Sequence, residues 1–234
     1  MNSLQIGSLA FLVLGPGLVW WWDRQPHRRG LVRVAERALA VGLVLAPLGD
    51  WAAKWHDGQF TPAHVLPMQL CDWALIAVVI ALWLRSRAAF DLAYFWGLAG
   101  TLQALFTPAI GADLAWIRQF GFFFIHAGIV AGVLHLMFTA RFRPEWPWSI
   151  VRIVLASEAY LVLALSINAL TGANYGFLSE KPSTRSMLDL FSDSQWLYAL
   201  QLNLTAFVFF AILYAPWALY DVLRARRKAP PAAV

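Results

Sequence analysis

Seven long apolar segments, separated by short polar connections, constrain this chain more than any other feature. The segments are Leu4–Trp22, Val34–Trp51, Met68–Leu84, Phe90–Phe106, Gln119–Ala140, Ile150–Leu170 and Trp196–Tyr220. Each is close to the ~20 residues that an α-helix needs to cross the hydrocarbon core of a bilayer. The pattern predicts an all-α, polytopic membrane protein, in which residues 1–222 form a bundle of seven transmembrane helices.

The basic residues are concentrated in alternate connections between these segments. One set of connections contains Arg24, Arg28, Arg29, Arg33, Arg37, Arg85, Arg87, Arg141, Arg143, Arg152, Arg224, Arg226, Arg227 and Lys228. The other set contains only Lys54, Arg118, Lys181 and Arg185. Because Lys and Arg are enriched in cytoplasmic loops, this asymmetry predicts an outer amino terminus and a cytoplasmic carboxyl terminus. Residues 223–234 would then be a basic cytoplasmic tail, irregular from Arg224 onward.

The basic character of the chain does not indicate a nucleic-acid-binding protein. The sequence pI is about 9.7, but no basic stripe interleaved with aromatic residues lies outside an apolar segment. The arginines lie where they fix topology and meet anionic headgroups, so membrane lipids are the expected partners. The single cysteine, Cys71, excludes an intramolecular disulfide and a Cys-based zinc or iron–sulfur cluster. No soluble cofactor is implied, and the oligomeric state is left open.

Polar residues inside the apolar segments are candidate site residues, because polar groups are expensive in hydrocarbon. With the predicted topology, most of them lie in the outer half of the bundle. This group consists of Gln69, Cys71, Asp72, Gln103, His126, Asn168, Gln201 and Asn203, with Glu158 nearer to mid-depth. The alternative is that the amide side chains form structural hydrogen bonds between helices, and that Cys71 packs as a small buried hydrophobic residue.

Cys71 and His126 are the residues in this group that suggest chemistry. A Cys with a nearby His is the minimal arrangement for a thiolate nucleophile, and Asp72 or Glu158 would orient the imidazole. His135 is nine residues after His126 and therefore faces the opposite side of the same helix. It lies on the face of Gly128 and Gly132, a Gly-xxx-Gly step typical of helix packing, so we interpret it as structural.

The longest polar segment, from Thr171 to Gln195, follows the sixth apolar segment on the predicted outer side. It contains Asn174, Tyr175, Lys181 and Pro182, and the stretch from Thr184 to Phe191 is a candidate for a short interfacial helix. We expect the segment to fold inward as a cap, with Asn174 and Tyr175 in contact with the bundle and with substrate. The alternative is a solvated connector, since loops of this length are often mobile.

Several stretches resemble a known family of membrane proteins. They are Leu66-Pro-Met-Gln-Leu-Cys-Asp72, the Phe-Trp-Gly-Leu-Ala-Gly segment with Thr107-Pro108, Phe122-Phe-Phe-Ile-His126, and the loop from Asn168 through Asn174-Tyr175 to Lys181-Pro182 with Trp196. Together they resemble the YwaF-like integral membrane family of bacteria across about residues 36–220. That family is similar to the eukaryotic transmembrane protein 164 family, whose members are implicated in acyl transfer on ether phospholipids through a Cys and a His.

The resemblance implies Cys71 as the nucleophile, His126 as its base, and a multi-pass location in the bacterial cytoplasmic membrane. The chain would then be a lipid acyltransferase or a thioesterase-like enzyme acting on an acyl lipid. Gln103 or Asn168 would donate hydrogen bonds to the oxyanion, and the remaining polar residues would bind substrate. The alternative function is a non-catalytic small-solute transporter or lipid-binding membrane protein, in which the same polar residues bind a ligand.

Overall fold

The computed structural model describes residues 3–108, 110, 115–182, 184 and 186–228, and these residues form helices and connections without a β-strand. The long helices are α1 (Ser3–Asp23), α2 (Arg29–His56), α4 (Leu70–Leu84), α7 (Trp116–Thr139), α8 (Trp148–Thr171) and α9 (Gln195–Lys228). α5 (Arg87–Trp96) continues through the π-helical turn η2 (Gly97–Thr101) into α6 (Leu102–Phe106). Shorter elements are η1 (Pro26–Arg28), α3 (Pro62–Val65), η3 (Tyr175–Phe177) and η4 (Met187–Leu190).

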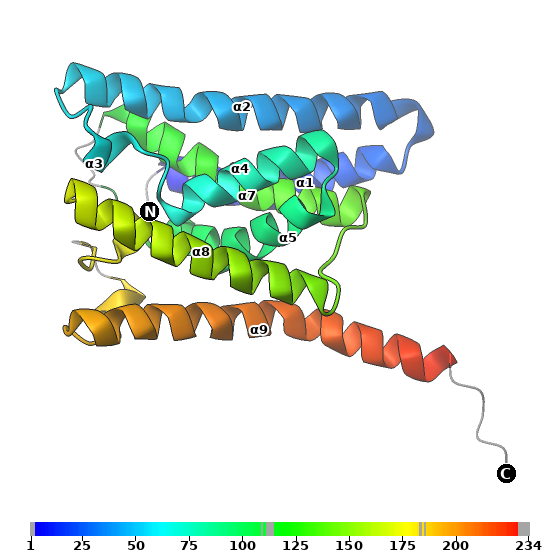
Figure 1. Cartoon of the computed structure of the whole chain (residues 1–234). Coiled ribbons are helices and arrows are strands. Elements are labelled where there is room, and N and C mark those ends of the chain that lie inside the picture. Colours follow the sequence, from blue (N-terminus) through cyan, green and yellow to red (C-terminus); the bar gives the residue numbers. More distant parts are fainter. Residues whose placement is uncertain (1–2, 109, 111–114, 183, 185, 229–234) are drawn as a thin grey trace, which may run out of the picture.

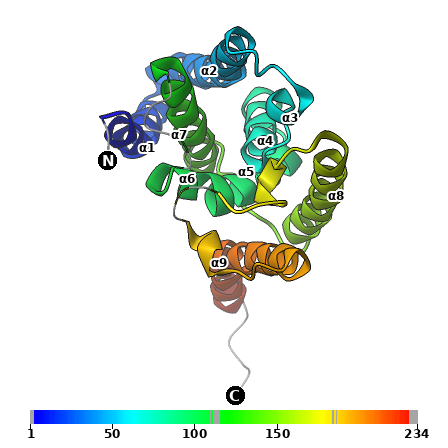
Figure 2. The ribbon, with the colours of Figure 1, turned by 90° about the vertical axis from the view of Figure 1, so that its left-hand side faces the viewer.

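The long helices lie side by side with their axes roughly aligned (Figure 1). The end-on view shows α5 and α6 between the group α1, α2 and α7 and the helix α9 (Figure 2). Large side chains of α5, among them Phe90, Phe95 and Trp96, are almost fully buried and form the centre of the core. We call the end of the bundle with residues 57–69, 172–182 and 186–194 the loop end, and the opposite end the basic end.

Four helices are long and apolar enough to cross a membrane, namely α1, α7, α8 and the Gln195–Arg227 part of α9, and α4 is a shorter apolar helix. Side chains such as Leu14, Leu170 and Ile212 are largely exposed on the bundle surface. A soluble protein rarely shows so much apolar surface, whereas a bilayer requires it. The prediction of an all-helical membrane protein is confirmed at this level.

Close packing of α7 against α2 and α4 depends on two glycines. A Cβ atom at Gly128 would lie 2.8 Å from Cδ2 of Leu43 in α2, and one at Gly132 would lie 2.7 Å from Cγ2 of Val78 in α4. Distances this short leave no room for a side chain, so the Gly-xxx-Gly step brings three backbones together. The interpretation of this step as a helix-packing device is confirmed.

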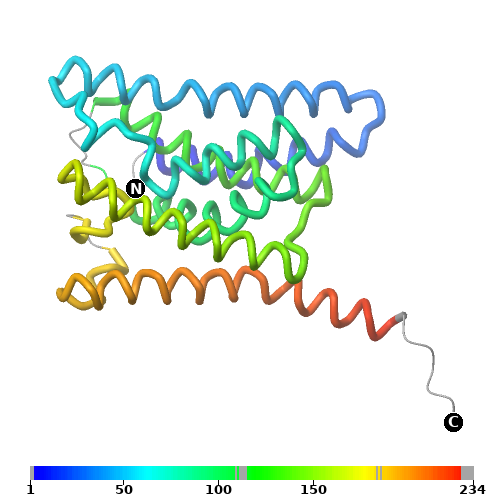
Figure 3. Tube along the Cα trace, in the orientation of Figure 1, coloured from blue at the N-terminus to red at the C-terminus, as the bar shows by residue number. Residues whose placement is uncertain are grey.

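The ends of the helices differ in two places from the sequence-based interpretation. α9 continues to Lys228 (Figure 3), so the expectation of an irregular tail from Arg224 is wrong for the part up to Lys228, and residues 229–234 lie outside the described residues. The predicted interfacial helix between Thr184 and Phe191 is a single 3₁₀ turn at Met187–Leu190, and Ser183 and Arg185 are outside the described residues. A hydropathy pattern detects only the apolar part of a helix, and α9 continues beyond that part into the mostly charged residues 224–228.

Candidate functional site

A cavity of about 650 Å³ opens at the loop end, between the end of α2, the start of α4 and the first half of α7. Five of the predicted site residues line it: Gln69, Cys71, Asp72, His126 and Tyr175. They come from α4, from the residue before it, from α7 and from η3, which are far apart in the sequence. The fold therefore brings the thiol and the imidazole to one cavity.

Cys71 is the second residue of α4 and its free thiol is half-buried. The helix begins at Leu70, and the carboxylate of Asp72 accepts a hydrogen bond from the main-chain N–H of Gln69 (2.9 Å from N to Oδ2). This contact satisfies a donor that has no partner within the helix. Asp72 thus fixes the start of the helix that presents Cys71 to the cavity.

His126 is buried in α7, and its Nδ1 lies 2.7 Å from the main-chain oxygen of Phe122. Because a carbonyl oxygen only accepts, Nδ1 carries the proton and donates it to Phe122. Nε2 is then the acceptor nitrogen of the ring. The contact that orients the imidazole is therefore a main-chain carbonyl of its own helix, where the sequence suggested the carboxylates of Asp72 or Glu158.

The lining of the cavity includes charged residues of both signs, Asp50, Lys54 and Arg118, of which the sequence indicated only the two basic residues, as topology signals. Nε of Arg118 donates to Oδ1 of Asp50 at 2.8 Å, and Nζ of Lys54 lies 2.6 Å from Oδ2 of the same carboxylate. Nζ of Lys54 also donates to the main-chain oxygen of His64 at 2.6 Å. These side chains connect α2, α3 and α7 at the entrance and line the cavity.

The loop after α8 folds onto the bundle through Tyr175, whose side chain is 3% exposed. Its hydroxyl donates to the main-chain oxygen of Pro62 (2.7 Å) and accepts from the N–H of Leu66 (3.1 Å). Burial raises the pKa of this phenol above its usual range, which keeps it neutral and able to donate. The expected contact of Tyr175 with the bundle is confirmed, while Asn174 bonds within the loop to Ser179 and Glu180. The contact of both residues with substrate stays a prediction.

A further hydrogen bond fixes this loop beside the cavity. Oε1 of Gln69 accepts from the N–H of Gly176 at 2.9 Å, and Gly176 has a φ of +67° that favours glycine. A Cβ at this position would also lie 2.6 Å from the hydroxyl oxygen of Tyr160. Gln69 therefore holds the loop through its side-chain oxygen and also lines the cavity.

Asn168 holds the same loop from beneath, and its replacement by Ala is expected to release it. Nδ2 donates to the oxygen of Tyr175 (3.0 Å), and Oδ1 accepts from the N–H of Tyr175 (2.8 Å). Asn168 is 5% exposed. Asn168→Ala leaves the N–H of Tyr175 without a partner, at a cost of about 1–3 kcal/mol, while the oxygen of Tyr175 keeps only the N–H of Leu178 at 3.4 Å. Limited proteolysis should cut the loop faster in this variant than in the exposed control Ser166→Ala, and equal rates would contradict the prediction.

The other predicted site residues do not line this cavity. Nε2 of Gln103 donates to the oxygen of Ala99 one turn earlier, and Oε1 of Gln201 accepts from the N–H of Ser192. Glu158 and Asn203 form a hydrogen bond of 2.7 Å between α8 and α9. These contacts connect helices or stabilise local structure, which is the alternative that the sequence left open for the amides.

The model of the TMEM164 family matches residues 2–214, which is nearly the whole chain. The protein belongs to the TMEM164 family. This membership confirms the resemblance to the transmembrane protein 164 family, while the narrower YwaF-like assignment stays a prediction. No curated protein and no solved structure matches the chain.

Proposed function

We propose that this TMEM164 family member is a membrane-embedded enzyme that transfers acyl chains of phospholipids through a thioester on Cys71. The observation that carries the proposal is the shared cavity: the only cysteine of the chain and the buried imidazole of His126 line the same space. Apolar residues, among them Val44, Leu75 and Ile125, line much of this cavity, and its rim is charged. This combination suits an acyl chain joined to a zwitterionic headgroup.

The chemistry follows from the protonation state of the two groups. The thiol of Cys71 becomes a strong nucleophile only when a base takes its proton. Nε2 of His126 then accepts that proton while Sγ attacks the ester carbonyl carbon. The C–O bond of the ester breaks, and His126 returns the proton to the leaving alcohol, which is a lysolipid. The side-chain NH₂ of Gln69, a residue that lines the cavity, would stabilise the oxyanion.

In the second half of the reaction the acyl chain leaves the enzyme. The hydroxyl of an acceptor lysolipid, or of water, gives its proton to His126 and attacks the thioester carbonyl. The C–S bond breaks, and the imidazolium restores the thiol of Cys71. Acyl transfer and hydrolysis differ only in the acceptor, and the loop held by Tyr175 and Asn168 would favour transfer by limiting the access of water.

The acyl-enzyme is the direct test of this function. The purified chain in phosphatidylcholine nanodiscs is incubated with a phospholipid that carries an alkyne in its acyl chain. We expect a label on Cys71 that hydroxylamine removes, and no label on Cys71→Ala. A matched control, Cys71→Ala with Leu84→Cys, carries its thiol on the lipid-facing surface at the other end of α4 and should stay unlabelled. Absence of a label in the wild type would leave a transporter or lipid-binding protein as the better interpretation.

We propose that the chain crosses the bacterial cytoplasmic membrane seven times, with the loop end outside and the basic end in the cytoplasm. The segments α1, α2, α4, α5–η2–α6, α7, α8 and α9 would be the crossings. Support comes from the arginines at the connections of the basic end, such as Arg24, Arg85 and Arg143, and the positive-inside bias. Tyr175 and the charged rim would then face the outer interface.

The topology gives a separate prediction. A reporter fused after Lys228 is expected to be active in the cytoplasm, and a tag placed before Leu4 should be accessible from outside in intact cells. An even number of crossings would place both ends on one side of the membrane. That result would overturn the seven-crossing proposal.

A further inference from the structure

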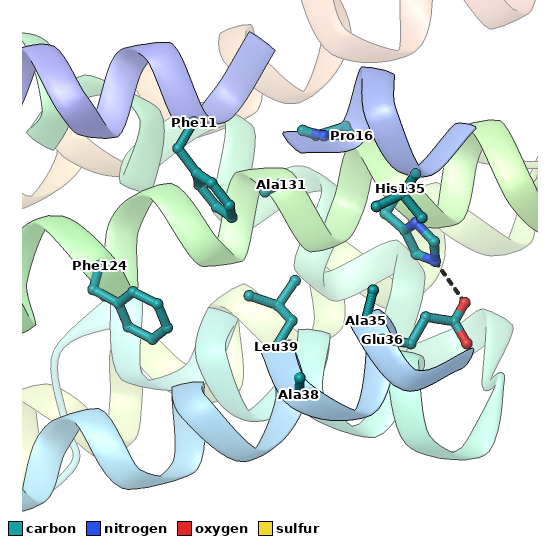
Figure 4. A pocket seen from close by; sticks show the side chains of 10 residues that line it. Phe11, Pro16, Ala35, Glu36, Ala38, Leu39, Phe124, Ala131 and His135 are labelled. Carbon is teal, nitrogen blue, oxygen red and sulfur yellow. Dashed lines mark hydrogen bonds and ion pairs between the residues drawn. The ribbon is translucent and has the colours of Figure 1, made fainter. Parts of the chain in front are cut away.

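A second cavity, of about 310 Å³, lies between α1, α2 and α7, and shares no lining residue with the cavity of Cys71. Its walls are almost entirely apolar (Figure 4); the apolar lining residues are Phe11, Pro16, Val19, Ala35, Ala38, Leu39, Phe124 and Ala131. Phe11 is 41% exposed and Ala38 is also exposed, so the cavity reaches the surface of the bundle between α1 and α2. A molecule that enters there comes from the bilayer.

The remaining lining residues are a carboxylate and an imidazole at one end of the cavity. Glu36 of α2 and His135 of α7 are each 5% exposed, and Nε2 of His135 lies 2.5 Å from Oε1 of Glu36 (Figure 4). Arg85, in the turn between α4 and α5, donates to the same carboxylate oxygen. Three elements therefore meet at one atom of Glu36.

This contact determines what the pair offers to a ligand. Since the carboxylate of Glu36 only accepts, Nε2 of His135 carries the proton in the neutral ring, and Nδ1 is left as an acceptor. Among the described residues neither Nδ1 of His135 nor Oε2 of Glu36 has a hydrogen-bond partner. Both residues line the cavity, so a ligand bound there can donate a hydrogen bond to an acceptor that has no partner within the protein.

The charges at this end are already balanced without a ligand. The guanidinium of Arg85 neutralises the carboxylate of Glu36, so a second cation gains little and an anion meets the carboxylate. The best complement is an uncharged hydrogen-bond donor at the end of an apolar chain. A volume of about 310 Å³ is at the lower end of the range for small-molecule sites, which suits one chain better than two.

We propose that this cavity is a binding site for a single-chain lipid alcohol, whose hydroxyl donates to the Glu36–His135 pair and whose alkyl chain occupies the space between α1, α2 and α7. The site is separate from the acyl-transfer centre and does not depend on Cys71. The bilayer offers such a hydroxyl in two forms, a long-chain alkanol and a monoacylglycerol. They present the same donor and chain, and differ in the bulk beside the hydroxyl.

Photolabelling of the full chain in phosphatidylcholine nanodiscs tests the site. The probes share one alkyl chain with a diazirine and end in an alcohol, a methyl ether, a carboxylate or a monoglyceride. We expect the alcohol to label peptides that contain Phe11 or Phe124 at least tenfold more than the methyl ether or the carboxylate. Excess unlabelled alkanol should suppress this labelling. Labelling by the monoglyceride at the level of the alcohol would identify a glyceride as the occupant, and labelling by the alkanol alone would identify the simple alcohol.

Two variants test whether the labelling takes place in the cavity. Ala35→Leu fills the space beside Glu36 and should reduce labelling by the alcohol at least fivefold, whereas Val34→Leu, on the exposed face of the same turn, should leave it unchanged. Equal labelling by the alcohol and the methyl ether would overturn the proposal, because the pair would then be only a structural link between α2 and α7. Unchanged labelling of Ala35→Leu would also overturn it. If Ala35→Leu fails to fold, the comparison of probes on the wild type decides alone.

Discussion

Replacement of His126 by Asn is expected to slow formation of the acyl-enzyme by about 10²–10⁴-fold, the usual contribution of a general base. The amide NH₂ of Asn can still donate to the carbonyl of Phe122, so the helix keeps its local contact. It has no basic nitrogen to take the proton of Cys71. Single-turnover labelling by the alkyne-tagged phospholipid measures the rate, and the melting temperature shows that the fold is retained.

The matched control is another histidine at the loop end. His56 ends α2, its side chain is 90% exposed, and it does not line the cavity of Cys71. His56→Asn should therefore leave the labelling rate within a factor of about two, well below the effect of losing a base. A wild-type rate in His126→Asn would mean that another group accepts the thiol proton. The mechanism proposed for Cys71 would then lose its base.

The long helices could be predicted from the sequence, because each contains a continuous apolar segment of nearly the length that a membrane crossing needs. All seven apolar segments coincide with helical stretches of the bundle to within a few residues at most ends. The interruption at Gly97–Thr101 could not be predicted, since Gly97 and Gly100 do not break the long apolar stretch of the segment Phe90–Phe106. The π-helical turn includes Gly97, which packs closely against Ile129 of α7, and a turn of this kind leaves no hydropathy signal.

The sequence predicts how far along its helix each candidate residue lies, but not which side of the helix it faces. Cys71, His126 and Gln69 share a depth and also a cavity, whereas Glu158 and Asn203 turn toward each other between α8 and α9. Depth follows from counting residues from a span end. The side that a residue presents depends on which helices pack against its own, and this packing cannot be seen in a single sequence.

The pair Glu36 and His135 was missed for the same reason. The two residues are 99 positions apart, and His135 was interpreted as structural because it lies near Gly128 and Gly132. Close packing at those glycines brings α2 toward α7, and this approach is what allows the carboxylate to reach the imidazole. The sequence therefore predicts the close packing at these glycines, but it does not predict that this packing brings His135 into contact with Glu36.

Loss of Arg152 is expected to have the largest effect on stability, because it leaves a buried carboxylate with half of its partners. Asp91 of α5 is 2% exposed; its Oδ2 accepts from Nη1 of Arg152 at 2.7 Å and its Oδ1 from Oγ of Ser149 at 2.8 Å. Removing one partner of a buried ion pair typically costs about 3–5 kcal/mol. For a chain of this length, Arg152→Ala should lower the melting temperature in detergent by about 6–20 °C.

Substitutions of the partner residue Asp91, and of an arginine in an exposed ion pair, provide the controls. Asp91→Ala should cost less than Arg152→Ala, because the guanidinium of Arg152 is 42% exposed and can turn to water. The double variant should be more stable than Arg152→Ala alone, a non-additivity that isolates the unpaired carboxylate. Arg87→Ala breaks the exposed ion pair with Glu145, which is worth at most about 1 kcal/mol. If Arg152→Ala is no less stable than Arg87→Ala, Asp91 must be hydrated or protonated in the folded protein. The contact between α5 and α8 would then rest on apolar packing and the hydrogen bond from Ser149.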